Sequence, residues 1–443
     1  MTEVELLTAA WYGDNPITIT FPSSWNVTVV GAINVPGLTD NEIRERFINP
    51  IGVPRLSVLA SKRNRVAIII DDITRPTPTA KLIPFILEEL KQAGINNDSI
   101  IIVVASGTHT RASEDDIIKK VGESLVNKIR VNAHDFKRDL VYLGKSSRGT
   151  PLFINQAIIE CDLKIGVGCI YPHTSAGFSG GSKILMPGVC GIETVRYMHN
   201  YLRGAKKRGG SLENDLRLDI EEVAGKVGLD FIINAVLGQK REIAGLFIGD
   251  KILAHREGVK FATELYSVGL ERNADIVVSN MYPFDTSLQY VPSRGFWPLL
   301  ESGGKISKVA IAACPMGLGY HALAPLSRSI KSRFLNRLKY FNLKEFKFLL
   351  SSLRTLKKVL MRQSMEFMML SQGITKEELK TVFPKAKLFS TWSELLNELE
   401  FCHKNLPVKV TVYPCSPLQM PGLNEFSANQ NLLMTETQTG LVE

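Results

Sequence analysis

Residues 65–109 read RVAIIIDDITRPTPTAKLIPFILEELKQAGINNDSIIIVVASGTH, and this stretch decides the fold class. Arg65–Ile70 and Ser99–Val104 are continuous apolar runs rich in isoleucine and valine, which is typical of buried strands. Lys81–Ala93 lies between them with apolar residues at helical spacing, and Gly94 follows it as a stop signal. A strand, a polar loop, a helix and a second strand in this order predict an α/β sheet.

The strand pattern continues on both sides of this stretch. Strand-like runs come earlier, at Ile17–Phe21 and Val27–Val30, and Leu163–Val167 repeats the buried-strand character. A second series of strands begins at Asp275–Ser279 and continues at Lys308–Ala313. Because 443 residues exceed one ordinary domain, we expect two α/β domains with an active-site cleft between them.

We place the boundary between the two domains within residues 262–273. The N-terminal domain then covers residues 1–265, and a C-terminal domain that closes the cleft covers residues 270–407. The segment 408–425 is a candidate to complete the N-terminal domain. Residues 426–443 are polar, and we expect them to form a loose tail.

The composition is that of an ordinary globular chain, with 44% hydrophobic and 22% charged residues. The opening residues lack the basic and apolar regions of a signal peptide, and no run reaches the roughly 18 apolar residues of a membrane span. The six cysteines are scattered without a CxxC pair, which is typical of reduced thiols. These features predict a cytoplasmic protein.

The net charge of +9 comes from one segment. Residues 321–362 contain eleven lysines and arginines against a single acid, Glu345, so the rest of the chain is close to neutral. The charge therefore does not predict a specific nucleic-acid partner. The segment is either a solvated helical face or a contact with an anionic surface such as a membrane.

Three polar segments follow three predicted strands. They are Asp71–Thr77, Ser106–His109 and Gly168–Lys183. In an open α/β sheet, ligands bind beyond the carboxyl ends of the strands. We therefore expect these segments to form one site.

The densest of them is YPHTSAGFSGGSKILMPG, residues 171–188. Its glycines permit positive φ angles and a close approach of backbone N–H groups to an anion. Lys183 after GGS is similar to a phosphate cradle, although the GxxxxGK[ST] spacing of a P-loop is absent. The structural alternative is a glycine-rich turn that packs a helix against the sheet.

His109 and His173 each lie just past a predicted strand, in loops rich in glycine, serine and threonine. A single histidine is more often structural, but two in one site suggest a pair of acid and base groups. Arg75 offers a planar fork of donors for a substrate carboxylate, and the carboxylate pair Asp71-Asp72 at the strand end is suited either to bind hydroxyls or to orient a histidine. The alternative for Arg75 and Asp72 is a capped turn with a surface ion pair.

Several motifs together resemble the nickel-pincer lactate racemase family. They are DDITRPTP (71–78), GTH (107–109), YPHTSAGFSGGSKILMPG (171–188), ETVRYMHN (193–200), EIAGLFIGD (242–250), AHREGV (254–259), CPMGLGYH (314–321) and VYPCSPLQMP (412–421). The resemblance extends from about residue 10 to residue 425. It implies an isomerase that racemises or epimerises a 2-hydroxy acid.

The resemblance also implies a nickel-pincer nucleotide as cofactor, a pyridinium-3,5-bisthiocarboxylic acid mononucleotide that carries nickel. Lys183 would be joined covalently to one arm, and His199 would complete a near-square-planar nickel centre. The remaining cofactor contacts would come from Thr74, Ser175, Ala176, Gly177, Gly180 and Gly181.

In the implied mechanism, one of His109 and His173 removes the hydroxyl proton while the C2 hydride passes to the cofactor. Hydride then returns to the opposite face of the planar 2-keto acid, and the other histidine supplies the proton. Arg75 would clamp the carboxylate, with Asp72 in support. The cofactor carries the difficult chemistry, and the protein orients the groups.

The sequence departs from the lactate-type pattern where the substrate is selected. That pattern has a Tyr-Gln pair and a nearby lysine, whereas this chain has Gln289-Tyr290 and Arg294. The tryptophan expected from a later helical region is missing from residues 363–370. Since an arginine fork suits a second carboxylate or several hydroxyls, we expect a dicarboxylate or sugar acid in place of lactate.

Two other functional classes are open at this point. A non-catalytic protein that binds nickel or a nucleotide would keep Lys183 and His199 but would need neither His109 nor His173. A metal-dependent hydrolase would need a ligand cluster such as HExxH, which the sequence lacks. The presence of both histidines favours an enzyme.

Overall fold

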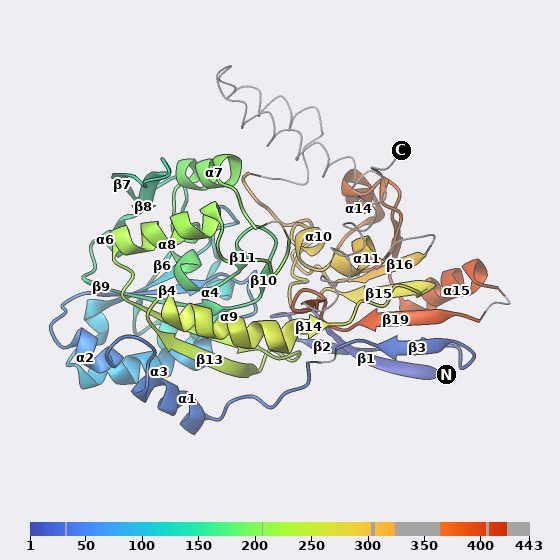
Figure 1. Ribbon diagram of the computed structural model, residues 1–443, viewed down its shortest axis with the longest axis horizontal. Helices are drawn as coiled ribbons and strands as arrows, with labels where there is room; N and C mark the ends of the chain where they lie inside the picture. The colour runs from blue at the N-terminus through green and yellow to red at the C-terminus, as the bar shows by residue number, and fades with distance from the viewer. Residues whose placement is uncertain (32, 206, 303–305, 324–363, 405–406, 423–443) are drawn as a thin grey trace, which may run out of the picture.

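The structure is a computed structural model. It describes residues 1–443 except 32, 206, 303–305, 324–363, 405–406 and 423–443. Two six-stranded sheets lie in the two halves of the molecule, with helices packed around them (Figure 1). The α/β fold class predicted from the sequence is confirmed.

The first sheet has the strand order β13-β12-β9-β4-β5-β6. Its strands are β4 (Val66–Asp71), β5 (Ile100–Ala105), β6 (Arg130–Ala133), β9 (Leu163–Cys169), β12 (Phe231–Leu237) and β13 (Ile243–Gly249). All neighbours are parallel except β12 and β13, which run antiparallel. Every residue of β4 and β5 is buried, because alternate side chains enter two separate cores, one on each face of the sheet.

The helix predicted between the first two strands is confirmed. It is α3 (Thr79–Gln92), and Gly94 follows it with a φ of +81°. Its buried residues include Leu82, Ile86 and Leu90, which join the same core as alternate residues of β4. The helical spacing of apolar residues in the sequence therefore correctly predicted which face of α3 packs on the sheet.

The second sheet has the order β18-β17-β16-β15-β19-β3, and all its neighbouring strands are parallel. Its strands are β3 (Asn26–Val29), β15 (Ile276–Asn280), β16 (Ser307–Ile311), β17 (Met368–Leu370), β18 (Lys387–Phe389) and β19 (Lys409–Tyr413). The hairpin of β1 (Thr2–Thr8) and β2 (Asn15–Phe21) packs its apolar side chains into a core of this sheet.

The segment 408–425 contributes to both halves of the molecule. We expected residues 408–425 to complete the N-terminal domain. β19 pairs with β15 inside the second sheet, whereas Cys415, Leu418 and Met420 after it join a core of the first sheet. The N-terminal strand β3 in turn pairs with β19, so both ends of the chain build the same half (Figure 1). An apolar strand shows only that it needs partners, because its sequence does not say which sheet supplies them. The division into two domains and the cleft between them stay predictions.

Helices surround both sheets. The longer ones are α1 (Asp40–Ile48), α4 (Glu114–Val121), α7 (Ile192–Tyr201), α8 (Asp215–Val227), α9 (Leu253–Tyr266), α14 (Lys376–Val382) and α15 (Trp392–Cys402). The short ones are α2 (Leu56–Ala60), α5 (Glu123–Val126), α6 (Gln156–Ile159), α10 (Val291–Arg294), α11 (Trp297–Glu301) and the 3-10 helices η1 (Asn97–Ser99) and η2 (Gly181–Ile184). Four two-residue strands and one further hairpin complete the list: β10 (Pro172–His173), β11 (Gly177–Phe178), β14 (Ser267–Val268), β20 (Met420–Pro421), β7 (Leu140–Lys145) and β8 (Pro151–Asn155).

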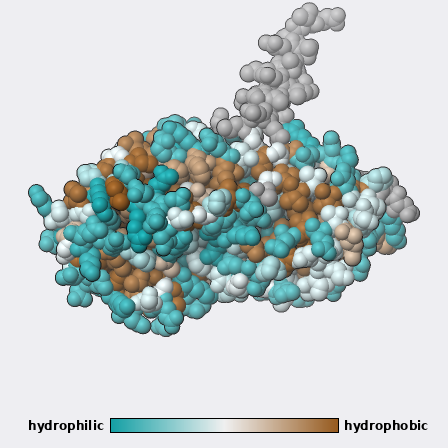
Figure 2. Space-filling model, turned by 90° about the horizontal axis from the view of Figure 1, so that it is seen from below, coloured by the Kyte–Doolittle hydropathy of each residue, from teal (hydrophilic) through white to brown (hydrophobic). Residues whose placement is uncertain are grey.

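Within the described part of the chain, no helix combines the length and the apolar character needed to cross a membrane. Hydrophilic and apolar areas alternate over the face shown in Figure 2, without one continuous apolar band. The basic segment 321–362 lies almost wholly outside the described residues, as does the tail predicted for residues 426–443. The alternatives for the basic segment therefore stay open.

Candidate active site

The ends of neighbouring strands bring the predicted residues together. β4 ends at Asp71 and leads into Asp72, and the adjacent β5 leads into the loop that ends at His109. Nδ1 of His109 lies 2.7 Å from Oδ2 of Asp72. The carboxyl ends of two neighbouring parallel strands therefore bring Asp72 and His109 into contact, although they are 37 residues apart in the sequence.

Asp72 also connects His109 to Arg75. Its other oxygen, Oδ1, accepts a hydrogen bond of 2.6 Å from the Thr74 hydroxyl. That hydroxyl in turn accepts a hydrogen bond of 2.7 Å from Nη1 of Arg75. The result is a chain of contacts from the guanidinium through threonine and carboxylate to the imidazole.

The charges in this chain have stable protonation states. Burial alone would raise the pKa of Asp72, but His109, Arg75 and the Thr74 hydroxyl outweigh it and hold that pKa well below its usual range. Burial lowers the pKa of His109, and Asp72 offsets this only in part. At neutral pH the pair is a carboxylate and a neutral imidazole, in which Nδ1–H donates to Asp72 and Nε2 is left as the basic nitrogen.

Asp71, the other member of the aspartate pair, has a structural partner. Its Oδ1 lies 2.6 Å from Nζ of Lys120, whose side chain is fully buried on α4. Lys120 also donates to the carbonyl oxygens of Thr77 at 2.9 Å and Arg75 at 3.3 Å. Sequence reasoning missed Lys120, because a lysine near the end of a charged helix ordinarily points to solvent.

His173 lies on β10, which pairs with β11 across the tight turn of the glycine-rich segment. Its Nδ1 accepts hydrogen bonds of 3.1 Å from the backbone N–H groups of Ser175 and Ala176. Burial, followed by Lys183 and Arg294, lowers the pKa of His173 far below its usual value. The neutral ring therefore carries its proton on Nε2, the opposite arrangement from His109.

Lys183 lies on η2, and Ser182 separates it from two consecutive glycines with positive φ angles. Gly180 has a φ of +77° and Gly181 a φ of +60°, and a Cβ on Gly181 would lie 2.8 Å from Cγ of His255. The N–H of Gly181 donates to Oδ1 of Asn234 at 2.6 Å. Burial, then the charges of Arg75 and Arg294, lower the pKa of Lys183 far below its usual value, which favours a neutral and nucleophilic amine.

Arg217, a buried residue that sequence reasoning missed, binds the backbone of the glycine-rich segment. Arg217 of α8 is fully buried and donates to the carbonyl oxygens of Ala176, Phe178 and Gly180. Gly177, with a φ of +73°, lies inside the same turn. The segment is thus a rigid scaffold as well as a candidate cradle for an anion.

The second half contributes the three tentative substrate residues, and all three are buried. The ring of Tyr290 meets that of His109 edge to face, with centroids 5.0 Å apart. Nη1 of Arg294 donates to the hydroxyl of Tyr171, and its guanidinium lies 5.0 Å from the centroid of that ring. The backbone N–H of Gln289 donates to the carbonyl of Leu318 at 2.9 Å.

His321 also reaches the site from the second half. Its ring centroid lies 5.4 Å from that of His109, and the N–H of Ala322 donates to the carbonyl of Thr108 at 2.9 Å. Burial, with His109 and His199 nearby, lowers the pKa of His321 to about 2. The sequence signal was its position at the end of a glycine-rich loop, which alone does not separate it from a structural histidine.

His199, the predicted nickel ligand, lies on α7 with an exposed side chain. It is close enough to His321 to influence the protonation of that ring, and His321 contacts His109. Within the described residues, no group of three or more histidine, cysteine, aspartate or glutamate side chains is arranged to hold a metal ion. A nickel ion here would need other donors besides His199.

Comparisons with known proteins show to which family the chain belongs. Residues 12–210 match the lactate racemase N-terminal domain family. A lactate racemase of Lactiplantibacillus plantarum is 34% identical over 301 residues, which are 65% of this chain and 70% of that protein. The chain belongs to the lactate racemase family. A second member, from Thermoanaerobacterium thermosaccharolyticum, is 31% identical over 299 residues, 65% of this chain and 69% of that protein.

Solved structures show the same fold. The lactate racemase apoprotein of Thermoanaerobacterium thermosaccharolyticum superposes with a TM-score of 0.72 at 24% identity, covering 95% of this chain and all of that one. A protein of Thermotoga maritima gives a TM-score of 0.62 at 18% identity, covering 86% and 97% of the two chains. The family membership makes this protein an isomerase of the racemase and epimerase class, as the motifs implied.

Proposed function

We propose that the protein inverts the C2 centre of a small 2-hydroxy acid, with a nickel-pincer nucleotide joined to Lys183 and ligated by His199. The observation that carries the proposal is the buried meeting of Asp72, His109 and Arg75 at the end of β4, with Tyr290 against the histidine. A site that only bound a nucleotide would have no use for a carboxylate-oriented base beside a carboxylate receptor.

The residues around Lys183 fit the proposed cofactor. Lys183 is largely buried and favours the neutral amine, which suits a covalent bond to a thiocarboxylic arm. Ser182 next to it is fully buried, and its hydroxyl has no hydrogen-bond partner among the described residues, so it can serve a bound nucleotide. The cofactor would bring donors of its own for nickel, so His199 alone would suffice as the ligand from the protein.

When bound at Lys183 and His199, the cofactor would supply the hydride-transfer chemistry at C2. The residues of the chain do the rest. His109, with Nδ1–H bonded to Asp72, presents Nε2 as the base for the substrate hydroxyl proton. Arg75 binds the carboxylate. Asp72 is buried and His109 and Arg75 are partly buried, which limits the access of water to the reacting centre.

The two histidines are not equivalent in this arrangement. His173 carries its proton on Nε2 and donates from it to the substrate oxygen. It can take up a proton there only if its own proton moves to Nδ1, which would end both backbone contacts with Ser175 and Ala176. We therefore propose that His109 is ready to act as a base in the resting state. For the reverse reaction, His173 must first move its proton from Nε2 to Nδ1, which requires a change in its ring contacts.

The substrate is proposed to be larger than lactate. Arg294 presents a guanidinium to the site, and Tyr290 packs on His109. An arginine fork recognises a second carboxylate or neighbouring hydroxyls, which lactate does not have. A dicarboxylate or a sugar acid of the 2-hydroxy class meets this requirement.

The decisive experiment is to co-produce the full chain with the enzymes that make the cofactor. We expect a mass adduct on the peptide that contains Lys183, nickel in proportion to the adduct, and inversion of at least one longer 2-hydroxy acid in an enantiopure panel. Variants His109→Gln and His173→Gln should keep the adduct and lose inversion.

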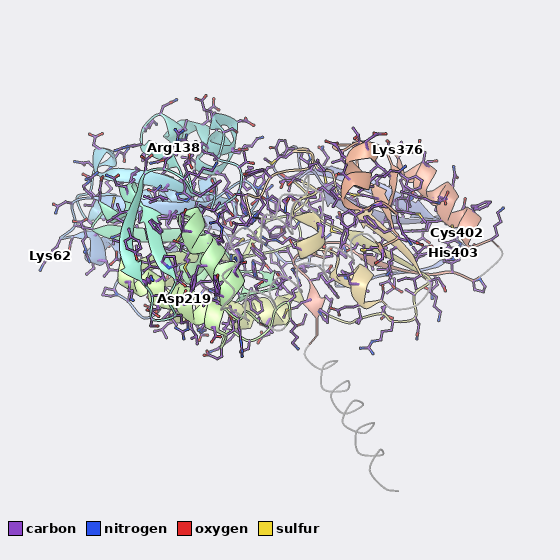
Figure 3. The ribbon with its side chains drawn as sticks, turned by 90° about the horizontal axis from the view of Figure 1, so that it is seen from above. Lys62, Arg138, Asp219, Lys376, Cys402 and His403 are labelled. Carbon is purple, nitrogen blue, oxygen red and sulfur yellow. The ribbon has the colours of Figure 1, made fainter. Side chains whose placement is uncertain are left out.

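His403→Gln is the matched control, since His403 follows α15 at the far end of the second half (Figure 3). It should keep both the adduct and the activity. Absence of any adduct, or full activity in the His109 and His173 variants, would contradict the proposal. Rapid turnover of lactate alone would remove the substrate assignment but leave the mechanism.

A further inference from the structure

A second arginine lies next to Arg294. Arg208 is in the loop after α7, and its Nη2 donates to the carbonyl oxygen of Pro417. Its Nε and Nη1 are buried and have no hydrogen-bond partner among the described residues. Buried guanidinium donors without acceptors are costly, so their presence indicates a ligand that supplies oxygen atoms.

The charge of Arg294 acts on Arg208, and the hydroxyl of Tyr171 acts electrostatically on both arginines. Among the described residues, neither of the two forms an ion pair with a carboxylate. The described polar and aromatic partners of Arg294 are the hydroxyl of Tyr171 and the faces of the Tyr171 and Phe284 rings. Burial, together with Arg294, lowers the pKa of Arg208 to about 9.

The two arginines continue the row that begins at Arg75. Arg75 is among the charges that act on Arg294, and Tyr171 and Tyr290 lie close to both residues. Asp72 balances Arg75 through Thr74, whereas Glu301 acts on Arg208 only electrostatically and the described residues form no ion pair with either of the other two guanidinium groups. Among the described residues, Arg75 thus has a carboxylate close by, whereas Arg208 and Arg294 lack a carboxylate in direct contact.

We propose that Arg208 and Arg294 form a second oxyanion site, which binds the distal carboxylate of a 2-hydroxy dicarboxylate whose first carboxylate contacts Arg75. This rests on the proposed function and names the substrate class for that site. A carboxylate has two oxygens for the free Nε and Nη1 donors of Arg208, in the parallel geometry that arginine favours. The phosphate of the nucleotide offers similar oxygens and is the competing source, which the experiment must separate.

The test is isothermal titration of the full chain, with and without cofactor, using malate, lactate and inorganic phosphate as probes. We expect malate to bind about tenfold more tightly than lactate or better, since charge-assisted hydrogen bonds are lost with lactate. Arg208→Gln and Arg294→Gln should each bring the ratio of malate affinity to lactate affinity close to one. Arg75→Gln should weaken both acids.

Two controls accompany these variants. Arg44→Gln removes the same charge from an exposed ion pair on α1 and should change nothing. Arg208→Lys keeps the charge but loses the fork, and it should recover only part of the malate preference. Thermal denaturation checks that each variant is folded.

Three results would overturn the inference. The first is equal binding of malate and lactate to the unmodified chain. The second is an equal loss of affinity for both acids in Arg208→Gln. The third is that Arg208→Gln lowers the mass adduct at Lys183 without changing the malate-to-lactate ratio, which would assign Arg208 to the nucleotide phosphate. If the binding pattern is as expected but the loaded protein inverts no acid, the proposed function fails and the second oxyanion site stands.

Discussion

At the scale of single residues, Asp72 decides what His109 can do. The carboxylate accepts from Nδ1 and so leaves Nε2 for the substrate, which is the usual way in which proteins choose a histidine tautomer. Burial lowers the pKa of His109, and Asp72 is the largest contribution that raises it. Orientation and basicity of the same ring thus depend on one neighbour.

Asp72→Asn therefore tests both effects. The base must be neutral, so the rate falls as the pH drops through the pKa of His109, which lies below 6.5. Removing the carboxylate lowers that pKa further, and the acidic limb of the kcat profile should move to lower pH while kcat drops by about a hundredfold. The profile is measured with the enantiomer whose proton goes to His109. An unchanged limb, or one at higher pH, would contradict the assignment.

At the scale of elements, α4 supports the loop after β4. Its Lys120 is fully buried and joins Asp71 to the carbonyl oxygens of Thr77 and Arg75. The capping box of Ser113 and Asp116 fixes where the helix begins, and so where Lys120 lies. Arg75 thus depends on a helix that contributes no side chain to the proposed chemistry.

Removal of this buried cation should be costly. Lys120→Met leaves Asp71 as an uncompensated buried charge, and we expect a loss of about 3–5 kcal/mol in the free energy of unfolding. The double variant Lys120→Met/Asp71→Asn should recover part of the loss, because it removes both charges. Urea denaturation measures both. Equal stability of the single variant and the unmodified chain would disprove a structural role for the pair.

The turn before η2 offers a second prediction at this scale. Gly181→Ala places a Cβ against His255 at a φ of +60°, so we expect lower stability and less adduct at Lys183. The matched control is Gly225→Ala within α8, where an added Cβ meets nothing within 4 Å and helix propensity should stabilise by about 0.5–1 kcal/mol. Intact mass and thermal denaturation report on both. Full adduct formation in Gly181→Ala would show that the turn tolerates a side chain.

At the scale of the whole molecule, the second half is built from both ends of the chain. β3 is its edge strand, and β1 and β2 fill one of its cores. Asp285 of this half also accepts hydrogen bonds from the backbone of Ala9 and Ala10, at 2.7 and 3.1 Å. Residues 1–30 therefore belong structurally with a region that follows them by more than two hundred residues.

This arrangement predicts how fragments behave. Residues 33–266 should unfold cooperatively on their own, because they contain the whole first sheet. Residues 267–422 should not, since they lack β3 and expose the core that β1 and β2 cover. Joining residues 1–30 to that fragment through a flexible linker should restore a cooperative transition, as followed by circular dichroism. A cooperative transition without them would contradict this.

Local patterns in the sequence determined the fold class and the members of the proposed site. Apolar runs predicted β4, β5 and β9. The polar residues after these strands predicted Asp72, His109 and the segment that ends at Lys183 as site residues, because the carboxyl ends of parallel strands lie at one edge of the sheet. Only the tertiary structure placed β19 and β3 in the second sheet, since an apolar strand is compatible with any sheet that offers an edge. It also revealed Lys120, Arg217 and Arg208, because a charge becomes buried only through partners that are distant in sequence.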